Sequence, residues 1–219
     1  PLDAQTAAAG AFAPKFSSLS TNTFGPGQGG DLRIDTRHFI VRDGGEVEAG
    51  SLGPGPGGLL SIRASESMEV SGQAPLLGFA PQLGQASLAL GFGESFLADA
   101  FTVSSVASAN GSSGNAGSIE IETGQLRVLN GGVITSLPAG SGRGGQLTVR
   151  ASESIEIIGT TASGEVVSWI NTGTFGSGIS GNVTAIAPRV ILRDGGAIVS
   201  TSFSIGNAGT VTILASESV

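Results

Sequence analysis

The sequence predicts an all-β protein, a right-handed parallel β-helix, and three observations carry this prediction. The first is composition: 37 of the 219 residues are glycine and only 12% are charged, which excludes a protein built from long helices. The second is internal repetition, because the motif ASES begins at Ala64, Ala151 and Ala215. The third is alternation of apolar and polar residues with a period of two, which is typical of strands with one buried face.

The repeats have a constant inner spacing. In each unit, two glycines that open strand-like runs lie 28 residues apart, as in Gly30 and Gly58, so one sequence repeat corresponds to two structural turns. Equivalent residues then recur in the same chain direction, which requires parallel pairing about 4.8 Å up one axis. Parallel crossovers are right-handed as a rule. We therefore expect partial rungs at both ends and about five full rungs, which begin at Gly30, Gly58, Gly117, Gly145 and Gly181.

Three short strands are expected in each rung. The first carries Leu32 and Ile34, with Arg33 between them facing water, and the second carries Phe39 and Val41. The third strand follows an Asp/Asn-Gly-Gly corner, which supplies residues with positive φ. These corners begin at Asp43, Asn130 and Asp194, and the third strands carry Val47, Ile134 and Ile198. Alternate turns gain one residue between the first and second strands, since Leu60 to Met68 is one position longer than Leu32 to Phe39.

Two segments depart from the repeat. Residues 1–15 are rich in alanine and match no unit, so we interpret them as a junction from an upstream region and residues 16–219 as one β-helix domain. The second turn carries about 23 additional residues within 73–100. This insertion is too apolar for a solvated loop. Two interpretations stay open: a flap or short helix packed on one face of the coil, or a contact surface for a partner.

The candidate partner contacts are Leu77, Phe79, Phe92 and Phe96 of the insertion, together with Trp169, the sole tryptophan. If Val166 and Ile170 point inward, then Trp169 points outward and could stack on a sugar ring. The opposite register would bury the indole ring, and this second register is the one we expect.

Composition also excludes several classes of function. The formal net charge of −7 repels nucleic acids and anionic membranes, and no apolar run approaches the roughly 18 residues needed to cross a bilayer. We expect no nucleic-acid partner and no membrane insertion. Cysteine is absent and His38 is the only histidine, which argues against a transition-metal site. The positions equivalent to Asp31 carry no second acid, so no calcium ladder is expected either.

The acidic residues do not predict an enzyme. Glycoside hydrolysis needs one pair of carboxylates in a groove, and several acids are dense enough to offer a pair. However, the glutamate of ASES recurs as Glu66, Glu153 and Glu217, whereas a catalytic constellation should occur once. We therefore expect no catalytic residue and no cofactor.

The runs GNAGSIEIETGQLRVLNGGVITS (residues 114–136) and GRGGQLTVRASESIEIIGT (residues 142–160) resemble the repeats of filamentous-haemagglutinin-like secreted proteins. The likeness is to the cyanobacterial type of two-partner secretion passenger and covers most of residues 16–219. It implies a β-helix that an outer-membrane transporter exports by recognising an upstream domain, which is not evident in this chain. It further implies display on the cell surface or release from it.

The sequence thus favours a structural, non-catalytic segment of a secreted or cell-surface adhesin-like protein, which extends and presents a surface to an unknown receptor or glycan. The alternative is a carbohydrate-binding or carbohydrate-cleaving β-helix that acts at the rung bearing the insertion.

Overall fold

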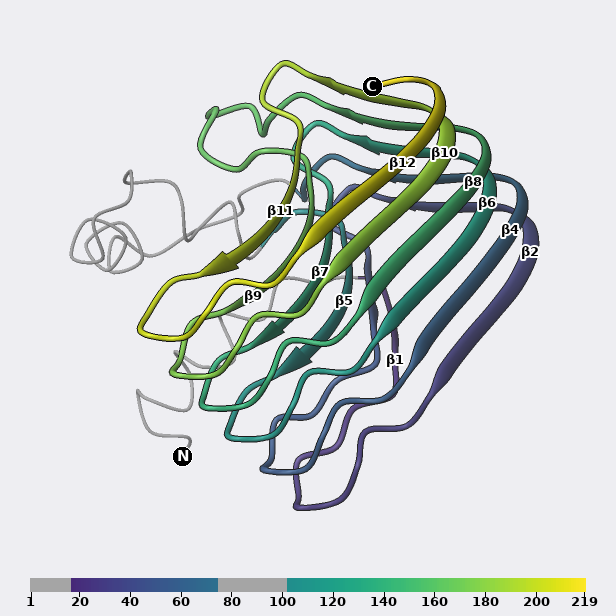
Figure 1. Ribbon diagram of the computed structural model, residues 1–219. Coiled ribbons are helices and arrows are strands. Elements are labelled where there is room, and N and C mark those ends of the chain that lie inside the picture. Colours follow the sequence, from purple (N-terminus) through teal and green to yellow (C-terminus); the bar gives the residue numbers. More distant parts are fainter. Residues whose placement is uncertain (1–16, 75–101) are drawn as a thin grey trace.

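The computed structural model describes residues 17–74 and 102–219, and this part of the chain is all-β. Its strands form two parallel six-stranded sheets (Figure 1). Sheet A contains β1 (Ser18–Ser20), β3 (Glu46–Glu48), β5 (Ser105–Asn110), β7 (Val133–Pro138), β9 (Trp169–Thr174) and β11 (Ala197–Ser202). Sheet B contains β2 (Leu32–Arg42), β4 (Leu60–Ser71), β6 (Ile119–Leu129), β8 (Leu147–Ile158), β10 (Val183–Arg193) and β12 (Val211–Ser218).

The chain alternates between the two sheets, so the strands of each sheet follow one another in sequence order. This arrangement is consistent with a β-solenoid. The expected junction at residues 1–15 lies outside the described residues, and so does nearly all of the insertion. Within the described ranges, no helix is long and apolar enough to cross a membrane.

Equivalent residues stack on one another in parallel register. One column of sheet B consists of Leu32, Leu60, Ile119, Leu147, Val183 and Val211. The next inward column contains Ile62, which is only 1% exposed. The predicted parallel stacking of like residues is therefore confirmed.

The first two strands expected in each rung are one continuous strand. β2 runs unbroken from Leu32 to Arg42, with a shift in register between Thr36 and His38 where the strand bends. β4 and β8 have 12 residues whereas β2, β6 and β10 have 11, and the ASES residues form the bend. The expectation of three separate strands was wrong, because a bulge lets a strand turn without losing its partner. The additional residue in alternate turns is confirmed.

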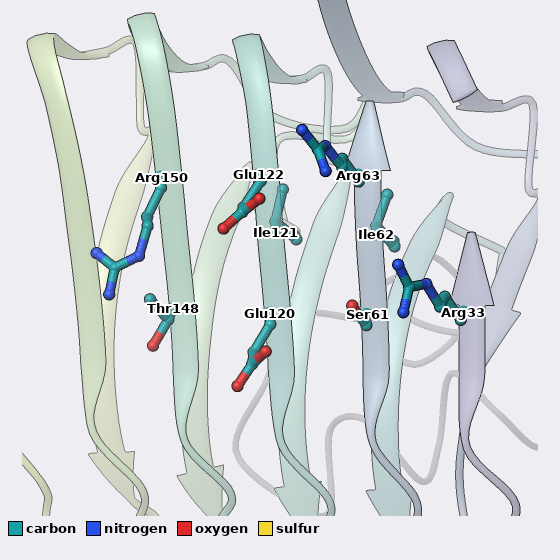
Figure 2. Close-up of a pocket in the computed structure, with 9 residues that line it drawn as sticks. All are labelled: Arg33, Ser61, Ile62, Arg63, Glu120, Ile121, Glu122, Thr148 and Arg150. Atoms are coloured by element: carbon teal, nitrogen blue, oxygen red, sulfur yellow. The ribbon is translucent and has the colours of Figure 1, made fainter. Parts of the chain in front are cut away.

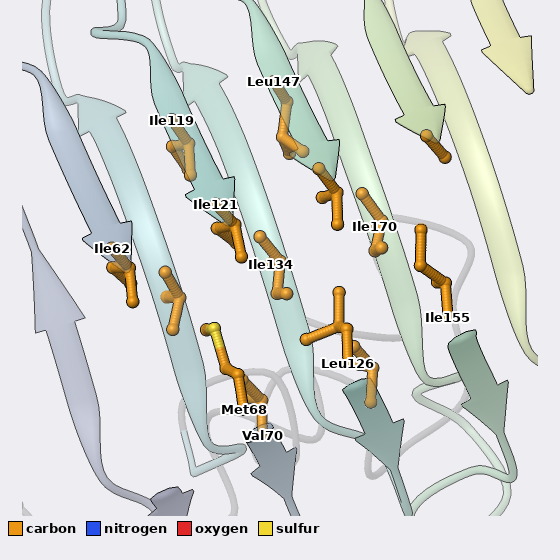
Figure 3. Close-up of a cluster of buried hydrophobic side chains, with 14 of the residues drawn as sticks. Ile62, Met68, Val70, Ile119, Ile121, Leu126, Ile134, Leu147, Ile155 and Ile170 are labelled. Atoms are coloured by element: carbon orange, nitrogen blue, oxygen red, sulfur yellow. The ribbon is translucent and has the colours of Figure 1, made fainter. Parts of the chain in front are cut away.

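The core lies between the two sheets (Figure 3). Ile121, Leu126 and Ile155 come from sheet B, and Ile134 and Ile170 come from sheet A; all are at most 1% exposed. They belong to one continuous cluster that follows the stack. Each coil therefore buries its apolar residues against the coils before and after it.

The corners before sheet A have the predicted conformation. Asp43, Asn130 and Asp194 have φ angles of 55°, 52° and 52°, and the glycine after each also has positive φ. Asp and Asn tolerate this region better than most residues do, and glycine has no Cβ to clash there.

Glycine has a different purpose at the opposite edge, where the chain returns from sheet A to sheet B. None of the return-edge glycines has positive φ. A Cβ on Gly142 would instead lie 1.8 Å from the carbonyl oxygen of Gly114 in the coil below. Two columns of glycine let the backbones approach this closely: Gly27, Gly55, Gly114, Gly142, Gly178 and Gly206, and Gly30, Gly58, Gly117, Gly145, Gly181 and Gly209.

Buried hydroxyl groups connect sheet A to the second glycine column. The Ser136 hydroxyl donates to the carbonyl oxygen of Gly117 at 2.9 Å and accepts from the amide of Gly145 at 2.9 Å. Thr172 occupies the equivalent position in the next coil and donates to Gly181 at 2.7 Å. Period-two patterning does not distinguish these inward hydroxyls from outward ones, so the sequence analysis missed them.

The Ser136→Val variant is expected to lose about 1–3 kcal/mol of unfolding free energy, because it leaves a buried carbonyl and a buried amide unpaired. Ser136→Thr is the matched control, since threonine already fills this position at Thr172, and it should retain most of the stability. Urea unfolding followed by circular dichroism measures both variants. Equal midpoints for the valine and threonine variants would contradict the assigned role of the hydroxyl.

Candidate contact surfaces

The outer face of sheet B carries a polar hollow of about 290 Å³. Figure 2 shows side chains from β2, β4, β6 and β8 around it. Its lining consists of Arg33, Ser61, Ile62, Arg63, Glu120, Ile121, Glu122, Thr148 and Arg150. The polar members point outward because they alternate along each strand with the core residues.

Charges of opposite sign adjoin one another across this face. Asp35 pairs in register with Arg63, Arg63 with Glu122, and Glu122 with Arg150. All four side chains are exposed. Among the described residues, Arg63 and Arg150 form no ion pair within 4 Å, and neither does Arg33. This alternating surface can therefore offer both signs of charge to a polar partner.

A second polar cluster marks the bend of β2 and β4. Glu66 accepts a hydrogen bond from Arg37, and its other oxygen lies 3.1 Å from Nε2 of His38, whose Nδ1 is 2.9 Å from the Ser67 hydroxyl. The hydrogen bond from Arg37 holds the pKa of Glu66 below its usual value, and the nearby positive charge adds to this effect. In the next ASES motif, Glu153 accepts from Gln125 at 2.7 Å. These glutamates therefore join neighbouring strands at the bulge.

No metal site is formed by the acidic and imidazole groups of residues 17–74 and 102–219, because no three of them gather closely enough. Asp31 instead accepts a hydrogen bond from the amide of Leu59 at 2.8 Å. Its carboxylate thus connects one coil to the next.

Trp169 lies on the outer face of sheet A. Val166, Ser168 and Ile170 are buried, and Ile170 belongs to the core, so the register that we expected, with the indole ring inward, was wrong. Ile170 takes the inward position because it aligns with Ile134 of β7 and Ile198 of β11. Trp169 is nevertheless half-buried, since its ring packs against three valines, Val103, Val133 and Val166.

An acidic pair occupies the outer face of β3. Burial raises the pKa of Glu46, and the neighbouring carboxylate of Glu48 raises it further. Asn22 donates to Glu48 at 2.6 Å. The residues that align with the pair on β5 are Ser105 and Ala107. Unlike the ASES glutamates, this pair is therefore not repeated in the adjoining coil.

Exposed apolar side chains form a ridge along the loops that follow sheet A. Phe175 is 52% exposed and Phe203 is 42% exposed, and their rings stack with centroids 4.8 Å apart. Phe24 and Leu52 are exposed at the equivalent positions of the first two coils, but the two coils between them and Phe175 carry Gly111 and Ala139 there. The sequence analysis overlooked the two stacked rings, although Phe175 and Phe203 stand at the same distance before the column glycines Gly178 and Gly206.

Trp169 is the one candidate partner contact that falls within the described residues; Leu77, Phe79, Phe92 and Phe96 fall outside them. The surfaces above are therefore the geometry from which function can be argued. In comparisons with known proteins, no family model, no curated protein and no solved structure matches this chain.

Proposed function

We propose that this chain is a right-handed parallel β-helix of about five full rungs, with partial rungs at both ends, which serves as a structural, non-catalytic segment of a secreted or cell-surface adhesin-like protein. The observation that carries the proposal is the stacking of equivalent residues through all six strands of sheet B. Interchangeable coils of this kind suit an extended spacer that presents a surface.

Export by an outer-membrane transporter, through a recognition domain upstream of this chain, is part of the proposal. It is supported by the resemblance of residues 114–136 and 142–160 to two-partner secretion passengers. A chain threaded unfolded through a pore gains from having no cysteine, and each new coil can stack on the one before it as it emerges. The proposed location is the outer cell surface or the surrounding medium.

The proposed contact surface is the charged hollow on sheet B. Its arginines are exposed and have no ion-pair partner among the described residues, so they are free to bind acidic groups of a receptor or glycan. The apolar ridge of Phe175 and Phe203 is the competing surface.

The test is a binding screen of the whole chain against cell surfaces and a panel of acidic and neutral glycans. We expect binding that is largely lost when Arg63 and Arg150 are both replaced by serine, and that falls as salt concentration rises. Arg193→Ser is the matched control, because Arg193 is an exposed arginine outside the hollow. A folded chain that binds none of these targets would contradict the proposal, and loss of binding only in Phe203→Ser would move the contact to the ridge.

The second candidate function is carbohydrate binding or cleavage beside the insertion-bearing turn. It is favoured by the acidic pair on β3, because a carboxyl group with a raised pKa is suited to act as a general acid. Release of sugar products from uronate or neutral glycans, abolished in Glu46→Gln, would favour this candidate over the spacer.

A further inference from the structure

We propose that the outer face of sheet A is a docking surface and that its occupant is residues 75–101 of the same chain. The face is defined by the outward residues of β5, β7 and β9, which include Ala107, Thr135, Trp169 and Asn171. The proposal is independent of the spacer role and concerns which sides of the solenoid are available to partners.

The first observation is that side chains on the outer face of sheet A are buried. Asn171 lies between two inward residues, Ile170 and Thr172, so its side chain points away from the core. It is nevertheless 0% exposed, and its neighbour Thr135 on β7 is 9% exposed. Outward residues on sheet B such as Arg63 and Glu122 are exposed. The outer face of a solenoid with a single core is normally exposed to solvent, so another segment must cover the outer face of sheet A.

The second observation is where the insertion leaves and re-enters the fold. Gln73 and Val103 form an antiparallel bridge, and the amide of Ala74 donates to the carbonyl oxygen of Thr102 at 2.8 Å. Val103 is buried in the same cluster as Val133 and Trp169. Ala74 and Thr102, which flank residues 75–101, are therefore held together at the border of the covered face.

An equivalent corner elsewhere in the chain has a short connection in place of the insertion and can be compared with it. Thr160 and Val167 form the same antiparallel bridge two turns further along, but there the connection is only the six residues from Thr161 to Val166. This short connection places Val166 against Trp169 and Val133. A connection at this corner thus turns toward the outer face of sheet A even when it is short.

The third observation is chemical. Both polar atoms of the Asn171 amide, the indole nitrogen of Trp169 and the hydroxyl of Thr135 are buried without a hydrogen-bond partner. An asparagine amide offers a donor and an acceptor side by side, which match the backbone of an adjoining segment. Residues 75–101 contain six leucines and four phenylalanines but only two charged residues, a composition suited to cover valine and tryptophan side chains.

The experiment replaces residues 74–102 with the six residues Thr161 to Val166, so that both corners have the short connection. Trp169 is the only tryptophan and there is no tyrosine, so intrinsic fluorescence reports on this face alone. We expect the emission of the shortened chain to shift to longer wavelength and its quenching by acrylamide to rise. Unchanged emission and quenching in a folded shortened chain would overturn the proposal.

Thiol labelling gives a second measurement, because the chain has no cysteine of its own. In the full chain, Thr135→Cys should react at least about tenfold more slowly than Glu120→Cys on the exposed face of sheet B, and the difference should vanish in the shortened chain. If the shortened chain does not fold, the full-length variant with Leu88, Leu90 and Phe92 replaced by serine carries the same expectation. Equal rates in the full chain, or protection that grows with protein concentration and so indicates a second copy, would overturn the proposal.

Discussion

Gly142→Ala should destabilise the protein by at least about 3 kcal/mol, the upper end of the usual effect of overpacking. The new Cβ would lie 1.8 Å from the carbonyl oxygen of Gly114 and 2.4 Å from its carbonyl carbon. Both are backbone atoms, which cannot rotate away as a side chain can. The coils on either side must therefore separate, and parallel hydrogen bonds on both sides of the return edge will lengthen.

Gly27→Ala is the matched control, because Gly27 begins the same glycine column and no coil of the described residues lies below it. A Cβ at this position meets no atom of the described residues within 4 Å, and the backbone φ is not positive. We expect unchanged stability or a gain of up to about 1 kcal/mol from the stiffer unfolded chain. Urea midpoints of the two variants test the contrast, and a similar loss in both would show that close stacking is not the reason for glycine here.

Ile155→Ala should lower the unfolding free energy by about 2–5 kcal/mol, the usual range for removing a large buried aliphatic side chain. Ile155 is fully buried in the middle of the stack, where it aligns with Leu126 on one side and Val190 on the other. The cavity would thus be lined by two coils that are themselves held in place by their own neighbours. Little collapse is possible, so the loss should lie in the upper half of the range.

Ile213→Ala provides the comparison within the same sheet. Ile213 is only partly buried and aligns with Ala185 of a single neighbouring strand. Its loss should be roughly half that of Ile155→Ala, because burial is approximately additive in the area removed from water. If both variants lost the same unfolding free energy, the stability of a coil would not depend on the coils packed on either side of it.

Much of the fold could be predicted because repetition supplies the same information several times. The spacing of 28 residues places Leu32 over Leu60, and the structure aligns these two residues in parallel. The Asp-Gly-Gly and Asn-Gly-Gly corners were predictable for a local reason, since positive φ restricts the choice of residue at one position. Patterns that arise from a single residue and its own backbone are the easiest to find in a sequence.

What could not be predicted depends on neighbours from other coils. From the sequence alone, Gly142 is indistinguishable from a glycine that a turn requires. The structure shows instead that glycine is needed there because the carbonyl oxygen of Gly114, 28 residues earlier, leaves no room for a Cβ. Trp169 was assigned to the wrong side because Ile170 and Trp169 are both apolar, and only the alignment with Ile134 decides between them. The charged hollow could not be predicted either, since Arg63 and Arg150 lie far apart in sequence. They come to the same face because both align with Glu122 of β6.

The alternation between 11-residue and 12-residue strands in sheet B has a consequence for how such a molecule can change its reach. From β2 to β10, every contact between successive strands of sheet B joins an 11-residue strand to a 12-residue strand. A gene duplication that copies coils in pairs therefore reproduces contacts that already fit. A duplication of one coil would set two strands of equal length side by side. Evolution can therefore extend the rod most safely by even numbers of coils.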